Sequence, residues 1–195
     1  MAGDRRSLAE RREQLLDAAV EVMSDKGVRG ATTRSITEHA GVPHGAFHYC
    51  FDSKDLLIRA LLEREIERAR SDEAAGAEQT KSLEQWLNRA LAGRVRQAME
   101  VPKREIVLAE LSQLGRTSPA LAVHLRWERE RYMEAVHEAI AARSDLDDSA
   151  VRDMTSLIVA SVAGIVDVWL LDRNDDNALT SVALLARACL ALARQ

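Results

Sequence analysis

Residues 32–54 read TTRSITEHAGVPHGAFHYCFDSK, and this stretch decides how the rest of the chain is interpreted. Thr32 can offer its hydroxyl to the free N–H groups at the start of a helix. Ile36 and Ala40 lie four residues apart, so they would share one face of that helix. Gly41 follows at the position where a helix often ends in a left-handed residue. The pattern predicts a short helix that ends in a glycine turn.

A second short helix is predicted directly after this turn, over residues 44–50. Pro43 suits the first turn of a helix, because the N–H that it lacks would have no partner there. Phe47 and Phe51 lie four residues apart and can both face the interior. Two short helices around a glycine turn have the outline of a helix-turn-helix, whose second helix enters the major groove of DNA.

The side chains left on the outer face of the second helix favour contact with DNA. They are His44, Gly45, His48 and Tyr49. Imidazole, phenol and exposed glycine backbone can all approach phosphates or base edges closely. Lys54 falls in the first turn of the following helix, where the helix dipole disfavours a cation, and a phosphate partner would explain it. The alternative is a helix-turn-helix that serves only as a packing unit and never touches DNA.

Three runs in this region carry a family resemblance: TTRSIT at 32–37, AGVPHGAFHY at 40–49 and FDSKDLL at 51–57. They resemble the DNA-binding domain of the TetR/AcrR family of transcriptional regulators, and the rest of the chain is similar to the family only in length and helical character. The resemblance implies a homodimer that binds a palindromic operator, usually as a repressor that a small effector releases. The residues predicted to bind DNA are Thr33, Arg34, Pro43, His44, Gly45, His48, Tyr49 and Lys54.

The composition of the 195-residue chain fits a folded, mainly helical protein. It is 47% hydrophobic, which is enough to bury a sizeable core, and it has only three prolines. The net charge of −4 is weak evidence against nucleic-acid binding, since a DNA reader needs only a local basic surface. Cys50 and Cys189 are far apart and no secretory segment is present, so we expect a reduced, cytoplasmic compartment. The longest apolar run, residues 157–171, is interrupted by small and charged residues, so no membrane span is expected.

The fold class predicted for the whole chain is all-α, with about nine helices. A three-helix, helix-turn-helix domain is predicted over residues 6–53 and a larger helical bundle, for effector binding and dimerisation, over 54–195. Residues 71–80, SDEAAGAEQT, are small and polar and are the best candidate for a linker. The first helix carries an arginine cluster that forms either a solvated face or an arm that reaches phosphates. The cluster consists of Arg5, Arg6, Arg11 and Arg12.

The last two predicted helices are apolar on more than one face, which favours a dimer. A monomer of this size can cover one face, and the other suggests a second copy about a two-fold axis in a four-helix bundle. The alternative is a central hairpin that is fully buried within a monomer. The predicted interface residues are Leu157, Ser161, Val162, Gly164, Ile165, Val168, Leu185, Cys189 and Leu192.

An effector site is predicted among the aromatic and methionine side chains of the second domain. Aromatic residues make up only 4% of the chain, and those on separate helices could converge on one pocket. Ordinary core packing explains each of them separately equally well. The candidates are Trp86, Met99, Trp127, Tyr132, Met133 and Trp169.

The sequence contains no motif that indicates catalysis, a cofactor or a metal site. Glu134 and His137 form one Glu-x-x-His pair, whereas a di-metal bundle needs two such pairs and two further carboxylates. Glycine-rich phosphate loops, G-x-S-x-G and zinc-ligand spacings are all missing. We therefore predict a ligand-responsive regulator that is not an enzyme. The alternative is a helical metal- or ligand-binding protein or enzyme whose helix-turn-helix only packs. The sequence specifies neither the operator nor the effector.

Overall fold

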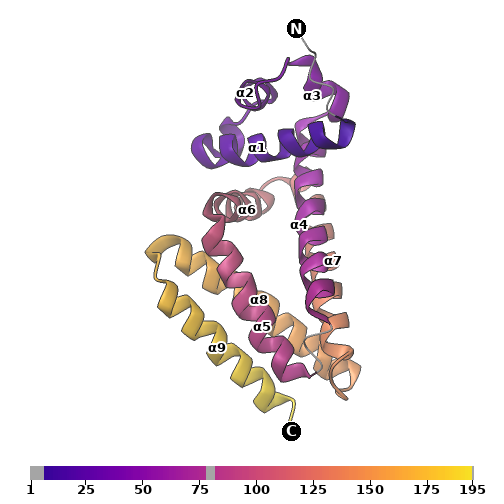
Figure 1. Cartoon of the computed structure of the whole chain (residues 1–195), viewed down its shortest axis with the longest axis vertical. Coiled ribbons are helices and arrows are strands. Elements are labelled where there is room, and N and C mark those ends of the chain that lie inside the picture. Colours follow the sequence, from indigo (N-terminus) through magenta and orange to yellow (C-terminus); the bar gives the residue numbers. More distant parts are fainter. Residues whose placement is uncertain (1–6, 78–81, 195) are drawn as a thin grey trace. The chain divides into compact units, whose positions relative to one another are not determined.

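The computed structural model describes residues 7–77 and 82–194, and every regular element in that part of the chain is a helix (Figure 1). The all-α prediction is therefore confirmed. Within the described ranges the helices are α1 (Leu8–Gly30), α2 (Thr33–His39), α3 (Gly45–Cys50), α4 (Lys54–Ala77), α5 (Leu83–Glu100), α6 (Pro102–Gly115), α7 (Pro119–Ala141), α8 (Asp148–Asp172) and α9 (Asp175–Leu192).

The helices group into two compact units, which we describe separately. The first consists of Met1–Arg64 and Ile106–Leu125, and the second of Glu65–Glu105 and Arg126–Gln195. Most of α6 and the start of α7 therefore belong with the N-terminal helices. The division of function between residues 6–53 and 54–195 stays a prediction.

The helix boundaries in the first unit follow from local capping. Ser7 begins α1 with a capping box, in which its hydroxyl accepts from the Glu10 amide and its own amide donates to the Glu10 carboxylate. Thr32 begins α2 in the predicted way, and its hydroxyl accepts from the Ser35 amide. Gly41 has a φ of 66°, which confirms the predicted left-handed turn between α2 and α3.

The core of the first unit forms beneath the short helices. Phe47 and Phe51 are buried, as predicted, and Ile36 from α2 packs in the same cluster. The long α1 supplies most of the remaining core. Its buried side chains before the glycine at position 27 are Leu15, Leu16, Ala18, Ala19, Val20, Val22 and Met23. The short helices therefore rest on a continuous apolar face of α1.

Gly27 interrupts α1 instead of ending it. Its backbone lies at φ 76° and ψ 157°, outside helical geometry, and a last turn follows over residues 28–30. This region of φ and ψ is essentially restricted to glycine. A Cβ at this position would lie 3.2 Å from the Glu110 carboxylate, so the site is also close to another side chain. The backbone conformation and the nearby carboxylate therefore both favour glycine at this position.

We expect Gly27→Ala to lower the free energy of unfolding by about 1–3 kcal/mol, because alanine is strained in this backbone conformation. Chemical denaturation measures the change. Gly30→Ala is the matched control, since a Cβ there meets only Lys26 Cβ, at an ordinary 3.5 Å. If the two variants proved equally stable, the strain argument would be wrong.

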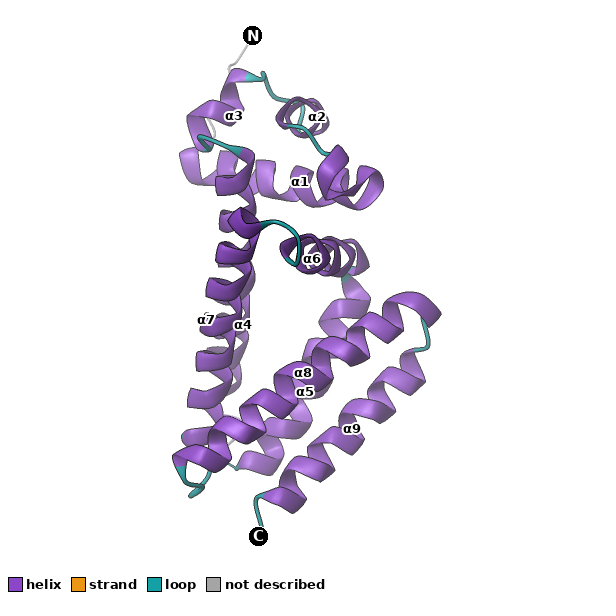
Figure 2. Cartoon of the chain, turned by 180° about the vertical axis from the view of Figure 1, so that it is seen from behind, coloured by secondary structure: helices purple, strands orange, loops and turns teal. Residues whose placement is uncertain are grey.

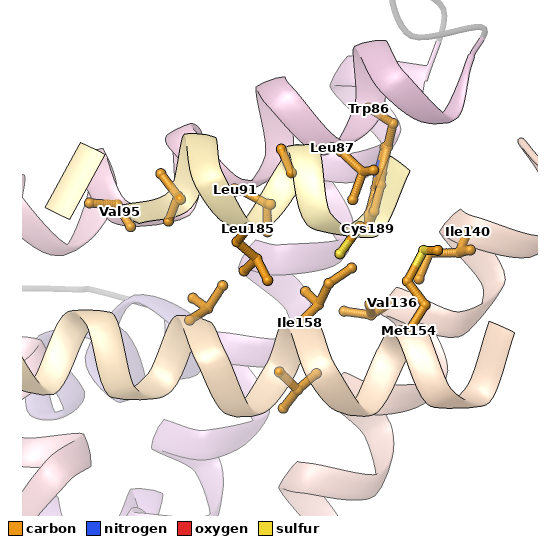
Figure 3. Close-up of a cluster of buried hydrophobic side chains, with 14 of the residues drawn as sticks. Trp86, Leu87, Leu91, Val95, Val136, Ile140, Met154, Ile158, Leu185 and Cys189 are labelled. Atoms are coloured by element: carbon orange, nitrogen blue, oxygen red, sulfur yellow. The ribbon is translucent and has the colours of Figure 1, made fainter. Parts of the chain in front are cut away.

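The second unit is built around α5, which packs against both α8 and α9. Figure 3 shows Leu87 and Leu91 of α5 close to Leu185 and Cys189 of α9, with Ile158 of α8 nearby. All of these side chains are buried within the single chain. α8 and α9 run antiparallel as neighbours and are joined by a short loop (Figure 2). This core accounts for one apolar face on each of the last two helices.

Capping again defines the helix starts in the second unit. Asp147 begins α8 and Asn174 begins α9, each with a side-chain oxygen that accepts from the amide three residues on. The predicted linker at 71–80 is wrong over residues 71–77, which continue α4, because alanine and glutamate are good helix formers. Residues 78–80 lie outside the described part of the chain.

Candidate nucleic-acid interface

The outer face of α3 carries the side chains that were predicted to meet DNA. His44, Gly45, His48 and Tyr49 are exposed, and 75% of the Tyr49 surface is accessible. The rings of His44 and His48 lie edge to face, with their centroids 5.4 Å apart. The opposite face of this short helix is buried through Phe47. α3 therefore presents two imidazoles, a phenol and bare glycine backbone together.

The predicted contacts on α2 and in the turn lie beside this face. Arg34 is exposed and pairs with Glu38 at 3.0 Å, a surface ion pair of the kind that contributes little to stability. Thr33 is half-buried at the start of α2, and Pro43 is exposed. The Thr37 hydroxyl donates to the Arg34 carbonyl and lies 3.5 Å from Nδ1 of His44. Thr37 is buried, and its contact with His44 joins α2 to the start of α3.

Two side chains of α1 donate hydrogen bonds to the C-terminal ends of α2 and α3. Arg12 Nη1 donates to the Cys50 carbonyl at 2.5 Å, at the C-terminal end of α3, and its guanidinium lies 4.4 Å from the centre of the Phe51 ring. Gln14 Nε2 donates to the Ala40 carbonyl at the end of α2. A cation at the C-terminus of a helix is favoured by the helix dipole. Sequence reasoning missed both contacts, because each joins residues far apart along the chain.

The arginine cluster near the start of α1 therefore does more than form a solvated face. Arg12 anchors α3, and Arg11 donates to the Gln14 side chain at 2.7 Å. Both guanidinium groups therefore donate to other residues of the first unit. Arg5 and Arg6 lie outside the described residues.

Lys54 has partners within the first unit. Its ammonium donates to the carbonyls of Val28 and Ala31, both at 2.5 Å. Burial lowers the pKa of Lys54, while the carboxylates of Asp55 and Glu110 act in the opposite direction. These carbonyls explain a lysine in the first turn of α4 without a phosphate. A contact between Lys54 and DNA stays a prediction.

The candidate effector residues lie mostly in the core of the second unit. Trp86 and Trp169 are buried, and Trp169 Nε1 donates to Asp175 at 2.7 Å. Met99, Tyr132 and Met133 pack against the same core, whereas Trp127 does not. Five of the six candidates therefore belong to or pack against one core, and their contacts are those of ordinary packing. An effector site among them stays a prediction.

The second unit also holds a buried polar cluster that the sequence did not indicate. Arg94 donates to Glu105 at 2.6 Å, and Arg104 pairs with the other oxygen of Glu105 at 3.0 Å and with Glu65 at 3.5 Å. Burial raises the pKa of the Glu128 carboxyl; Arg129 and Arg94 oppose the effect, and the Glu65 carboxylate adds to it. Folding therefore shifts the protonation equilibrium of Glu128 toward the neutral form, relative to the unfolded chain.

This raised pKa gives a pH-dependent expectation. The pKa of Glu128 is higher in the folded than in the unfolded protein. The stability that its protonated carboxyl contributes is therefore present at low pH, and it is lost as pH rises through the folded pKa. Glu128→Gln should therefore gain stability relative to the parent protein as pH rises from about 4 to about 7. Urea unfolding across this range measures the difference. Glu134→Gln, at an exposed position of the same helix, is the control for the substitution itself. A difference that does not change with pH would contradict the assignment.

The predicted dimer residues divide into two groups. Val162, Leu185 and Cys189 belong to the core shared with α5, so they are not available to a partner, and the prediction is corrected for them. The sequence could not show which apolar face each helix turns toward α5. The others are exposed or half-buried: Leu157, Ser161, Gly164, Ile165, Val168 and Leu192.

An apolar stripe remains exposed on α8 and α9 in the single chain. On α8 it recurs at three- and four-residue intervals, and on α9 it follows the same helical spacing. Within the described residues, α8 is also the one helix long and apolar enough to cross a membrane, a property shared by central helices of soluble proteins. The stripe consists of Leu157, Ala160, Gly164, Val168, Leu171, Leu184, Ala188, Ala191 and Leu192.

The Glu-x-x-His pair on α7 has ordinary partners. Glu134 pairs with Arg131 at 2.8 Å, and His137 Nε2 lies 3.1 Å from Asp148. No cluster of three or more potential metal ligands occurs among the described residues.

α2 and α3 have the arrangement of a helix-turn-helix, and the second of these helices exposes two imidazoles and a phenol to solvent. Residues 15–61 match the family model described as "Bacterial regulatory proteins, tetR family". This region of the chain therefore carries the DNA-binding domain of this family of transcriptional regulators.

Several curated relatives match over part of the chain. The chain is 43% identical over 54 residues to the HTH-type nicotine-responsive transcriptional repressor HdnoR of Paenarthrobacter nicotinovorans. This alignment covers 28% of each protein. It is 32% identical over 87 residues to the HTH-type transcriptional repressor KstR2 of Rhodococcus jostii, and this alignment covers 43% of each protein. The alignments thus span less than half of the length of these two relatives.

Solved structures match nearly the whole chain. A TetR-family transcriptional regulator from Rhodococcus sp. is 25% identical with a TM-score of 0.77, over 95% of this chain and 99% of that one. The regulator FadR of Bacillus subtilis, solved in complex with stearoyl-CoA, is 17% identical with a TM-score of 0.77, over 91% of this chain and 96% of that one. The second likeness concerns the fold alone.

Proposed function

We propose that this regulator is a ligand-responsive repressor that binds a palindromic operator as a homodimer in the cytoplasm. Each protomer would place α3 in one major groove, so that a dimer reads two half-sites about 34–36 Å apart, or a multiple of that distance. The exposed, anchored face of α3 is the observation that carries this proposal.

Each predicted contact then has a distinct role. Tyr49 and Lys54 would hold phosphates, and His44 and His48 would approach base edges. Thr33 and Arg34, at the start of α2, would contact the sugar-phosphate backbone of the DNA. Arg34 can exchange its exposed Glu38 partner for a phosphate at little cost, because such surface pairs are weak.

The dimer would form through the apolar stripe of α8 and α9. Soluble monomers rarely leave extended apolar surface uncovered, and a two-fold axis brings the same stripe from each copy together. The two hairpins would then make a four-helix bundle. The small residues Ala160 and Gly164 on the stripe would let the helices approach closely.

Response to a ligand is supported by the names of similar proteins and by the fold. One relative is named nicotine-responsive, and one structural neighbour was solved with stearoyl-CoA. Neither likeness assigns the chemistry of the effector to this chain, because the first covers only 28% of each protein and the second concerns the fold alone. An effector in the second unit would release DNA only if it binds the DNA-competent and DNA-free states unequally.

Fluorescence anisotropy of a labelled random-sequence duplex tests the DNA-binding step directly. We expect retention at low salt and a logarithm of affinity that falls linearly with the logarithm of salt concentration, because phosphate contacts release counterions. Protein that remained folded and yet bound no duplex at low salt would contradict the proposal.

A further inference from the structure

The interruption of α1 at Gly27 creates a backbone segment that other helices hold. After the positive φ of Gly27, the Val28 amide donates to Glu110 Oε1 at 2.9 Å. Glu110 lies on α6, 82 residues further along the chain, and Ile106–Leu125 belongs to the same compact unit as α1. A carboxylate that accepts from a backbone amide makes a stronger hydrogen bond than a neutral acceptor does.

The same segment is held on its carbonyl side by Lys54. The ammonium donates to the carbonyls of Val28 and Ala31, at 2.5 Å each. Residues 28–31 are therefore fixed through an N–H by α6 and through two C=O groups by α4. Glu110 and Lys54 carry opposite charges and attract each other, and the Glu110 carboxylate counteracts the effect of burial on the lysine.

This segment lies at the junction of the two DNA-reading helices. Ala31 is followed directly by Thr32, the residue that caps α2. Lys54 begins α4 three residues after Phe51, which closes α3. A shift of residues 28–31 would therefore move the start of α2 and, through Lys54, the end of the turn that follows α3.

We propose that Glu110 is a positioning residue for DNA binding, which acts through the Val28 amide and Lys54 to set the placement of α2 and α3. The inference rests on the proposed function, because it concerns affinity for DNA. It assigns part of that affinity to a side chain of α6, outside the helix-turn-helix and remote from its exposed face.

The test compares three variants of the full chain. Glu110→Ala removes the acceptor, Glu110→Gln keeps an acceptor oxygen without the charge, and Gln113→Ala is a control at an exposed position of the same helix. DNA affinity is measured at one salt concentration, where each variant is fully folded by circular dichroism. Hydrogen exchange of the Val28 amide is followed by NMR without DNA.

We expect Glu110→Ala to weaken DNA binding by about tenfold and to speed Val28 exchange by a similar factor, which corresponds to one lost hydrogen bond to a charged group. Glu110→Gln should recover most of both properties, and Gln113→Ala should match the parent protein. Rescue by glutamine distinguishes a positioned acceptor from a general loss of packing.

The possible results separate the inference from the proposed function. Parent protein that binds no duplex would contradict the proposed function, and Val28 exchange would still decide whether Glu110 holds this segment. If the parent protein binds DNA and folded Glu110→Ala binds it equally well, the inference is overturned. Unchanged Val28 exchange in Glu110→Ala overturns it as well, as does a loss of affinity that glutamine fails to rescue.

Discussion

Gly45→Glu should abolish DNA binding by a protein that remains folded. Gly45 is the first residue of α3, it is exposed, and a Cβ added there meets nothing within 4 Å. An acidic residue in the first turn of a helix is favoured by the helix dipole, so the fold should tolerate it. In the complex, however, the carboxylate would face the phosphates and base edges. Since both protomers carry it, we expect affinity to fall by about 100-fold or more.

Anisotropy titration measures this loss, and two controls make it specific. Gly45→Ala tests whether a methyl group alone disturbs the interface, and it should bind within about threefold of the parent protein. Gln113→Glu makes the same change of charge at an exposed position on α6 and should bind normally. Unimpaired binding by Gly45→Glu would show that α3 does not face the duplex.

Val168→Arg should separate the dimer into folded monomers. Val168 lies in the middle of the apolar stripe on α8, and 49% of its surface is exposed in the single chain. An arginine there costs a monomer little, but two copies would bring buried, unpaired charges together across a two-fold axis. Operator affinity should fall by about 100- to 10,000-fold, because the two half-sites would no longer be bound by one linked particle.

Sedimentation velocity gives the oligomeric state, and anisotropy on the operator gives the affinity. Val123→Arg is the matched control, because Val123 is 56% exposed on α7 and lies outside the stripe. The control should remain a dimer with normal affinity. If Val168→Arg remained a dimer, the interface would lie elsewhere. A monomeric parent protein would contradict the proposed homodimer.

Local sequence features predicted much of the fold. Thr32 caps a helix where its side chain indicated, and Gly41 adopts the left-handed turn that the spacing requires. Phe47 and Phe51 face inward, as their four-residue separation indicated. Such features depend on a few neighbouring residues, so the sequence displays them directly.

Contacts between distant residues could not be predicted in the same way. The carboxylate that meets the Val28 amide comes from 82 residues further along the chain, and the carbonyl partners of Lys54 come from the end of α1. A charged side chain gives no local sign of such partners, and for this reason a phosphate was the only explanation that the sequence offered for Lys54. α8 and α9 present the related problem of choosing between two apolar faces. Leu185 and Cys189 turned out to face α5.

Selection of bound duplexes from a random pool tests the central claim most directly, because it reports DNA binding, symmetry and spacing together. We predict enrichment of one inverted repeat, with half-site centres about 34–36 Å apart or a multiple of that distance. An enriched site without two-fold symmetry, or no enrichment by folded protein, would contradict the account.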